Sequence, residues 1–495
     1  MVYPLVAGFL SLSLLFSGSV GLTWQLKEGR KVGQTLCPSY PYPTVDPSTL
    51  LKVLGPFLEE LGQNMSTLIK STPGGAVVSV VYRDTVIWTH ADGLINMSDP
   101  TRGPPTADTG FRIGSITKVF TALMSLMLRD SGELRSLDDN ITAYLPQFSI
   151  KNPFQTRRGI TFRQLSCHMS GLSRNPPCPG IFDTGCNLTD DQIYENLSKL
   201  KLMFPPGFQP EYSNLGFGLL GRVLQTIRGP PWEEQVAQMV LKPLNMTNSG
   251  NSFTPDAVKN MAVGYYPDKT IAKLIDIGWD APAGQMYSSA NDLSQLLKLI
   301  FRPEYPYDID TEQILDGETI REWMQPAYTY ADGTGFGHPW ELWQLGDFIL
   351  RTKAGVMNGY NAELQFAHEI KTGFVFLHSC DGCSSHEPII ELSQKIISTV
   401  SEILEILKPG PSVPPSPSDY TGNYSIGAQG PTVAVVELGT VYDRKALLLL
   451  DSSGERSILD WRGEDEFQIS LHGGPQPCQH SQRGIRWRVG GIHKI

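Results

Sequence analysis

The chain has 495 residues, with 40 basic and 50 acidic side chains and a formal net charge of −10. This negative balance argues against nucleic acid as the main partner, because phosphate binding needs a basic stripe. Hydrophobic residues at 40% and charged residues at 18% exclude a disordered chain and allow a large core. Length alone predicts two or three domains of roughly 150 residues each.

The amino terminus predicts a targeting segment. Residues 5–16 are apolar apart from two serines, and small residues follow at 17–19, as in a secretory signal peptide. No charged residue precedes Lys27, so the stretch also just reaches the ~20 residues that cross a bilayer. An uncleaved anchor followed by Lys27, Arg30 and Lys31 would place the body in the cytosol. We therefore predict a signal peptide or a signal-anchor over residues 1–24.

Asn-x-Ser/Thr sequons favour the secretory interpretation, because the chain contains seven. Chance would supply roughly two in a chain of ordinary composition. We therefore expect a glycoprotein that is secreted or lumenal in the secretory pathway, with single-pass membrane anchoring as the alternative. The predicted acceptors are Asn64, Asn96, Asn140, Asn187, Asn196, Asn245 and Asn423.

The 7 cysteines are too few for a disulfide scaffold, and their odd number leaves at least one thiol free or paired with another chain. In an oxidising compartment, Cys178 and Cys186 are candidates for a local disulfide, because Pro and Gly turns lie in the loop that contains them. A second cluster has a spacing that could hold zinc, although a CxxC disulfide or a plain polar loop is the favoured interpretation. Its members are His378, Cys380, Cys383 and His386.

Proline-rich segments divide the chain. Residues 25–48 predict a spacer after the targeting segment. Residues 409–418 predict a linker between a body over 49–408 and a tail over 419–495.

The body begins and ends with a helix and a hairpin. Apolar periodicity predicts helices near Leu50–Ile69 and Glu387–Leu407. Runs of β-branched and aromatic residues predict a hairpin over 76–93 and another over 362–379. Because the middle is mainly helical, we expect an antiparallel sheet built from both ends of the body, flanked by helices and with a helical insert. This is an α+β fold and not the strand–helix alternation of a doubly wound fold.

The tail predicts a small all-β domain. Strand-like runs separated by Gly, Asp and Ser turns occupy 432–438, 445–451, 466–471 and 485–489.

Ser115 opens an apolar helix and is the first candidate for chemistry. At 3.6 residues per turn, Ser115 and Lys118 share one helix face, so the amine can relay the hydroxyl proton in the positive field of the helix N-terminus. S-x-x-K alone is a weak signal. Ser198 and Lys201 repeat it in a charged stretch that is typical of a solvated helix face.

Tyr212 and Asn214 lie in a loop just before another apolar helix. A tyrosine flanked by lysines can hold a lowered pKa and act as a base, because positive charge favours the phenolate. The Asn214 amide can fix Lys118 and a substrate carbonyl. Tyr194 and Asn196 repeat the Y-x-N pattern, so this motif is also weak alone.

Lys353, Ala354 and Gly355 form the third element. A small residue at a strand edge leaves the backbone open. The N–H of Val356 can then pair with that of Ser115 as an oxyanion hole.

In order and context, these three motifs resemble those of serine β-lactamases and penicillin-binding proteins. The resemblance is to the class C and esterase-like branch, whose middle motif is Y-x-N, and to the animal β-lactamase-like proteins. Collinear segments carry it: FRIGSITKVFTAL, LSCHMSGL, PPGFQPEYSNLGFGLLG, APAGQMYSSANDLSQLL and KAGVMNGYNAEL. It implies a β-lactamase/transpeptidase-like fold.

The resemblance also implies a role for each motif residue. Ser115 would be the acyl-accepting nucleophile and Lys118 its proton partner. Tyr212 would be the base toward the leaving group, Asn214 a contact of substrate and Lys118, and Lys353 the group that tunes Tyr212.

The chain departs from the family pattern in the third motif. Ala354 and Gly355 would line the substrate subsite, but Ala354 replaces the usual Thr or Ser and removes a hydroxyl that in the family helps bind the substrate carboxylate. Residues 371–373 spell K-T-G at a predicted hairpin turn, and we assign the motif to Lys353 instead. We expect Cys167 to be a buried small hydrophobe and His168 to be a structural histidine.

These observations predict a serine hydrolase that acts through an acyl-enzyme on an ester, amide or peptide substrate. The alternative is a catalytically silent, secreted binding or scaffold glycoprotein that retains the fold. We expect a small-molecule or peptide partner, no nucleic acid, no cofactor and no metal, and a membrane only if the N-terminal segment is an uncleaved anchor. A homo-oligomer is a further option.

Overall fold

The computed structural model describes residues 45–154, 159–302, 313–346, 348–383, 386–407, 413–425, 432–441, 444–451, 456–463, 466–470, 485–488 and 493–494. The predicted targeting segment 1–24, most of the spacer 25–48 and residues 409–412 of the linker lie outside these ranges.

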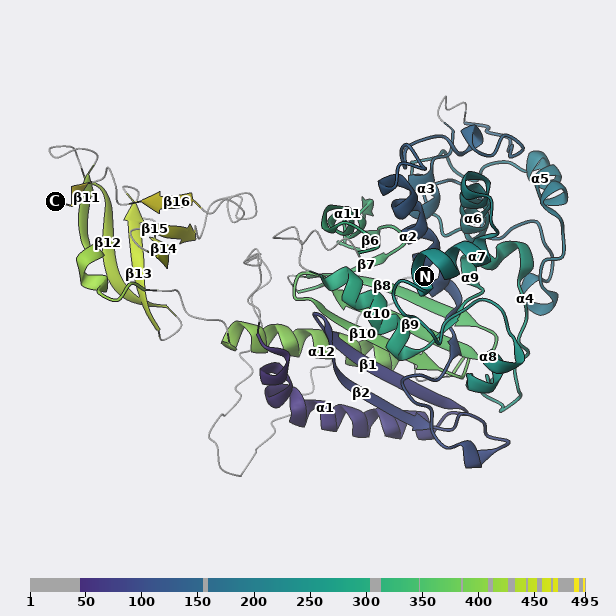
Figure 1. Ribbon diagram of the computed structural model, residues 1–495, viewed down its shortest axis with the longest axis horizontal. Coiled ribbons are helices and arrows are strands. Elements are labelled where there is room, and N and C mark those ends of the chain that lie inside the picture. The colour runs from purple at the N-terminus through teal and green to yellow at the C-terminus, as the bar shows by residue number, and fades with distance from the viewer. Residues whose placement is uncertain are drawn as a thin grey trace.

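An antiparallel sheet forms the centre of the body. Its strands are β1 (Gly75–Tyr82), β2 (Thr85–Gly93), β5 (Tyr328–Thr329), β6 (Gly335–Phe336), β7 (Glu341–Leu345), β8 (Phe348–Met357), β9 (Tyr360–Ala367) and β10 (Thr372–His378). They follow the order β2-β1-β10-β9-β8-β7-β6-β5 (Figure 1). β1 pairs with β10, so Ala76 lies opposite His378 and Tyr82 opposite Thr372. The prediction of one sheet built from both ends of the body is therefore confirmed.

Helices cover both faces of this sheet. The predicted terminal helices α1 (Pro47–Lys70) and α12 (His386–Leu407) pack against one face, and α10 (Ala290–Phe301) packs against the other (Figure 1). β1 is buried along its whole length because its side chains alternate between these two layers. α1 begins earlier than its apolar pattern predicts, since the Asp46 carboxylate accepts from the N–H groups of Ser48 and Thr49.

Most of the remaining helices lie on the side of the sheet that α10 covers and share one core cluster with α10 (Figure 1). The remaining helices are α2 (Thr117–Asp130), α3 (Phe162–Ser166), α4 (Ile181–Thr184), α5 (Asp190–Lys199), α6 (Asn214–Arg228), α7 (Trp232–Val236), α8 (Pro255–Asn260), α9 (Ala281–Gly284) and α11 (Gly317–Trp323). Short turns η1 (Pro100–Arg102), η2 (Gly114–Ile116), η3 (Ile141–Ala143), η4 (Ala237–Leu241) and η5 (Gly278–Asp280) and the paired strands β3 (Phe111–Arg112) and β4 (Tyr287–Ser288) connect them. This is the predicted helical insert.

The tail forms a second antiparallel sheet of its own, in the order β16-β15-β14-β13-β12-β11-β17. Its elements are η6 (Pro417–Tyr420), β11 (Gly422–Ser425), β12 (Thr432–Val441), β13 (Arg444–Asp451), β14 (Arg456–Gly463), β15 (Glu466–Ser470), β16 (Ile485–Arg488) and β17 (His493–Lys494). The four predicted runs fall on β12, β13, β15 and β16. β14 escaped prediction because arginine, aspartate and glycine interrupt its apolar residues, yet Leu459 belongs to the buried core of this sheet.

β8 passes unusually close to η2. A Cβ atom at Gly355 would collide with the carbonyl oxygen of Ile113 and would lie 3.1 Å from the nitrogen of Ser115. Only glycine lets the two backbones approach this closely. The contact therefore positions η2 against the edge of β8.

We expect Gly355→Ala to lower the free energy of unfolding by about 1–3 kcal/mol, because an added methyl forces two packed segments apart. Gly55→Ala is the matched control, since a Cβ at this position of α1 meets nothing within 4 Å. It should raise stability by up to about 1 kcal/mol through helix propensity. Chemical denaturation of both variants measures the difference, and wild-type stability of Gly355→Ala would contradict the close approach.

Candidate active site

Lys118 is buried at the centre of the candidate site, with 0% of its surface exposed. Its Nζ donates to Ser115 Oγ at 3.0 Å, to Asn214 Oδ1 at 2.8 Å and to the carbonyl oxygen of Ala283 at 2.7 Å. An ammonium has three protons, so each proton has an acceptor. These bonds offset the cost of burying a charge and hold η2, α2, α6 and α9 together.

The surroundings of Lys118 make its ammonium group give up a proton more readily than an exposed lysine does. Burial lowers the pKa of Lys118, and the charge of Lys353 lowers it further, while Tyr212 and Asp280 oppose the shift. A neutral amine can accept a proton, and the Ser115 hydroxyl lies within hydrogen-bond distance. The pair predicted from S-x-x-K spacing therefore has a geometry suited to activating a nucleophile.

Tyr212 lies directly before the N-terminus of α6, between two lysines. The ammonium groups of Lys118 and Lys353 lie 4.9 and 5.1 Å from the centre of its ring. Burial raises the pKa of Tyr212, but the two positive charges outweigh this effect and lower it to about 8. The phenolate is therefore accessible near neutral pH.

His168 supports the Tyr212 ring. The two rings stack with centroids 4.3 Å apart, and His168 Nδ1 accepts from the backbone N–H of Ser213 at 3.1 Å. Burial lowers the pKa of His168 well below its usual value, with further lowering by the nearby cations, so the imidazole stays neutral. This is the structural histidine that the sequence predicts.

Lys353 lies on β8 and is held by Glu341, which sequence reasoning missed. Its Nζ donates to Glu341 Oε1 at 2.7 Å. Burial lowers the pKa of Lys353, but Tyr212 and Glu341 together raise it above its usual value, so this lysine keeps its charge. The signal in the sequence was a single acidic residue inside the aromatic run HPWELWQL.

The two amides predicted for the oxyanion hole are close neighbours. β7 pairs with β8 only as far as Glu341 opposite Thr352, so the edge beyond Thr352 is not covered by β7. A Cβ at Gly114 would lie 2.9 Å from the nitrogen of Val356, which shows how closely η2 approaches this edge. The N–H of Ser115 lies at the start of η2, where helical N–H groups lack intrahelical acceptors.

A cavity of about 420 Å³ opens over these groups. From the predicted site, Ser115, Tyr212, Asn214, Lys353, Ala354 and Val356 line it. Lys118 lies behind Ser115, and Gly355 packs against Ile113. The other lining residues are Arg174, Phe182, Ile277, Asp280, Ala283, Gly284, Phe336, Glu341 and Met357.

The repeated motifs do not reach this cavity. Ser198 lies on α5 and its hydroxyl donates to the carbonyl oxygen of Glu195. Tyr194 is buried on the same helix. Lys371 lies in the turn between β9 and β10, 3.0 Å from His368 Nε2. Ser115, Tyr212 and Lys353, in contrast, line the cavity.

A disulfide-closed loop forms one wall of the cavity. The predicted bond between Cys178 and Cys186 is present, and Phe182 lines the cavity from inside this loop. Just before the loop, Asn175 Oδ1 accepts from Asn214 Nδ2 at 2.8 Å. The disulfide thus closes this wall, and the Asn214–Asn175 hydrogen bond connects it to the candidate site.

Cys380 and Cys383 also form a disulfide, so their sulfurs are not available as zinc ligands. This outcome matches the favoured interpretation of the CxxC segment. Cys167 is buried and unpaired, and burial raises the pKa of its thiol to about 12. It therefore behaves as the small hydrophobe that the sequence predicts.

Asp280 is a second residue that sequence reasoning missed. It is buried beside the cavity, and no hydrogen-bond donor within the described ranges reaches its Oδ1. Burial raises the pKa of Asp280 to about 7, against the opposing charges of Lys118 and Arg222. Nothing in the sequence around Asp280, which directly precedes APAGQM, indicates that it lies near Lys118.

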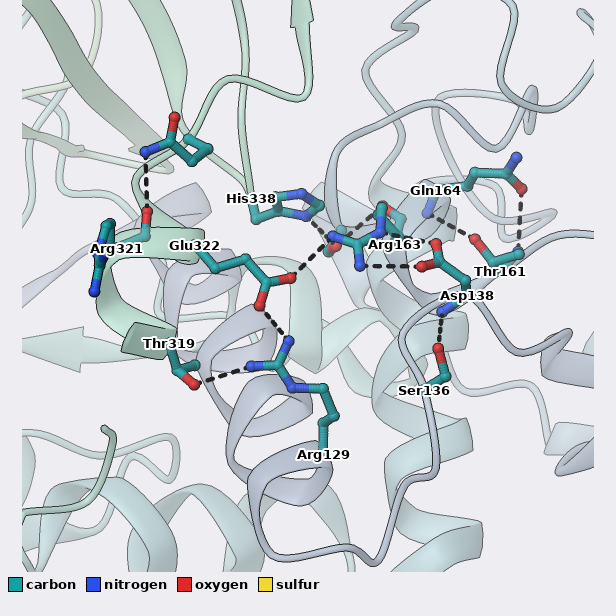
Figure 2. Close-up of polar contacts among 12 residues, drawn as sticks. Arg129, Ser136, Asp138, Thr161, Arg163, Gln164, Thr319, Arg321, Glu322 and His338 are labelled. Carbon is teal, nitrogen blue, oxygen red and sulfur yellow. Dashed lines mark hydrogen bonds and ion pairs between the residues drawn. The ribbon is translucent and has the colours of Figure 1, made fainter. Parts of the chain in front are cut away.

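A larger cavity of about 710 Å³ lies beside Arg163. The charged side chains around it form ion pairs with one another (Figure 2). Arg163 bridges Asp138 at 2.8 Å and Glu322 at 3.2 Å, and Glu322 also pairs with Arg129. This network joins α2, α3 and α11. Its lining thiol, Cys167, is too weakly acidic for a nucleophile.

Within the described ranges, no helix is long and apolar enough to cross a membrane.

Comparison with known proteins gives close relatives. A family model described as Beta-lactamase matches residues 64–388. Beta-lactamase-like protein 2 of Dictyostelium discoideum is 37% identical over 69% of this chain and 62% of its own length. Putative beta-lactamase-like 1 of Homo sapiens is 31% identical over 79% of this chain and 78% of its own length. The chain thus spans less than two thirds of the Dictyostelium relative.

Solved structures with the same fold are more distant in sequence. A class C beta-lactamase superposes with a TM-score of 0.57 at 19% identity, covering 72% of this chain and 98% of that one. The octameric penicillin-binding protein homologue from Pyrococcus abyssi superposes with a TM-score of 0.53 at 21% identity, covering 87% and 94%. The shared fold and the family match over residues 64–388 show that the chain belongs to the β-lactamase family.

Proposed function

We propose that the chain is a serine hydrolase that acts through an acyl-enzyme on an ester, amide or peptide. The observation that carries this proposal is the 3.0 Å hydrogen bond between Lys118 Nζ and Ser115 Oγ at the floor of an open cavity. A buried lysine with a lowered pKa beside a hydroxyl is an arrangement that activates serine.

The proposed reaction has two steps. Ser115 Oγ attacks the substrate carbonyl carbon, its proton passes to the Lys118–Tyr212 pair, and the oxyanion accepts from the N–H groups of Ser115 and Val356. Tyr212 then returns the proton to the leaving group as the carbonyl re-forms, which leaves Ser115 acylated. A water molecule attacks the acyl-enzyme by the same route and restores the hydroxyl.

We also propose that the chain enters the secretory pathway. The disulfides Cys178–Cys186 and Cys380–Cys383 support an oxidising compartment. Four of the sequon asparagines are exposed and therefore accessible to an oligosaccharyltransferase. They are Asn64, Asn187, Asn245 and Asn423.

We expect Ser115→Ala to abolish covalent labelling by a fluorophosphonate probe, because the variant lacks the nucleophile. Ser198→Ala, which alters the second S-x-x-K copy, is the matched control and should label at the wild-type rate. Intact-mass spectrometry and peptide mapping measure both. Wild-type protein that is folded but takes no label would contradict the proposal and favour the scaffold alternative.

The labelling rate should follow the ionisation of Tyr212. Because the phenolate accepts the proton, the rate should rise about tenfold per pH unit at acidic pH and level off above pH ~8. Lys353→Met removes one of the charges that lower this pKa, so the plateau should move toward the usual value of about 10.

Lys371→Met is the matched control for this pH profile, since Lys371 lies in a turn outside the cavity. Its plateau should stay at the wild-type pH. Stopped-flow labelling over a pH series measures all three proteins. Coincident profiles for wild type and Lys353→Met would show that Tyr212 is not the base.

Glycosylation should separate exposed from half-buried acceptors. Asn96 Oδ1 accepts from Ser98 N–H and from the Tyr265 hydroxyl, so its side chain is held within the fold. Secreted protein from cultured cells should carry glycans at the four exposed acceptors, as peptide mapping after enzymatic deglycosylation would show. Unmodified asparagine at all four would argue against the secretory pathway.

A further inference from the structure

The β8 side of the cavity has an unusual charge pattern. Lys353 Nζ donates to Glu341 Oε1 at 2.7 Å and to the carbonyl oxygen of Ala354 at 3.3 Å. Only 1% of the Lys353 side chain is exposed. Its positive charge is therefore already paired and largely withdrawn from any ligand in the cavity.

Glu341 is the partner that remains accessible. It lines the cavity and 29% of its side chain is exposed, in contrast to Lys353. Within the described part of the chain, Oε1 accepts from Lys353 and no donor is bonded to Oε2. A carboxylate oxygen thus stays open to a ligand on this wall.

The side chains of Ala354, Val356 and Met357 provide no hydrogen-bond donor for an anion. Ala354 contributes a methyl group, while Val356 and Met357 are apolar. A substrate carboxylate on this wall would meet a like charge without a hydroxyl donor.

The other charged groups that line the cavity belong to other elements, and Arg174 among them is exposed. Arg174 precedes the disulfide loop, with its guanidinium 5.0 Å from the centre of the Tyr212 ring. Lys118 is fully buried and bonded to three acceptors, and Asp280 is 1% exposed. Glu341 is therefore the accessible charge that the β-strand wall presents.

We infer that this wall selects substrates that carry an amino group near the scissile carbonyl and disfavours substrates that carry a carboxylate there, with Glu341 as the specificity-determining residue. This inference rests on the proposed function. An ammonium can donate a charge-assisted hydrogen bond to Oε2 while Lys353 keeps its bond to Oε1. A carboxylate at the same place is repelled.

The test compares p-nitrophenyl esters of β-alanine, butyric acid and succinic acid, whose acyl chains have similar length and end in an ammonium, a methyl and a carboxylate. Rates are corrected for hydrolysis without protein. Wild type should show kcat/KM about tenfold higher for the β-alanyl than for the succinyl ester. Glu341→Gln should lower the β-alanyl to butyryl ratio about tenfold and raise the succinyl to butyryl ratio.

The neutral ester separates selectivity from catalysis. Any effect of Glu341→Gln through Lys353 and Tyr212 changes the butyryl rate too, so the ratios isolate the charge. Glu60→Gln makes the same charge change on an exposed position of α1, across the sheet from the cavity, and should leave both ratios unchanged. Ala354→Thr adds a hydroxyl donor to the wall and should raise the succinyl to butyryl ratio.

The two levels of the proposal fail in distinguishable ways. Ratios for Glu341→Gln within twofold of wild type would overturn the role of Glu341 while Ser115 labelling still supports the hydrolase. A wild-type preference for the succinyl ester would overturn the substrate class. Folded protein with neither labelling nor ester turnover would remove the proposed function, and the inference with it.

Discussion

A buried lysine with three acceptors is the constraint on which the rest of this site depends. Lys118, at the start of α2, bonds Ser115 in η2, Asn214 at the start of α6 and the backbone of Ala283 in α9. Removing one partner of a buried charge is expensive, because the charge stays desolvated and loses its compensation. The relative positions of these three helices are thus fixed by the same bonds that bring an amine to the serine hydroxyl. The same three hydrogen bonds therefore stabilise the helix packing and position the groups of the proposed reaction.

The pKa values of the two lysines of the site shift in opposite directions, and their partners explain why. Lys118 bonds a hydroxyl, an amide and a carbonyl, all neutral acceptors, so burial lowers its pKa. Lys353 lies beside Tyr212 and bonds the carboxylate of Glu341, and these two groups raise its pKa despite equal burial. Tyr212 lies between them and its pKa falls. One lysine can therefore exchange protons while the other supplies a constant charge, which is the division that acid–base chemistry at neutral pH requires.

The sequence predicts those parts of the fold that depend on residues close together in the chain. The terminal helices, both hairpins and the pairing of Ser115 with Lys118 follow from periodicity, turn residues and helical spacing. Tyr212 and Lys353 were assigned through family resemblance, since nothing near them in the sequence shows that they meet. Glu341 was missed because its contact depends on the register between β7 and β8, and Asp280 because its proximity to Lys118 arises only after α9 packs.

The groups that we propose to react and the walls of the cavity come from different parts of the chain. Ser115, Lys118 and Asn214 lie at helix starts held by buried hydrogen bonds, whereas the walls include the disulfide-closed loop and residues of β7 and β8. Glu341 is linked to both, since its Oε1 accepts from Lys353 and its side chain lines the cavity. We therefore expect a change at this position to alter substrate charge preference and the Tyr212 environment together. For this reason, selectivity here has to be measured as a ratio between substrates and not as a single rate.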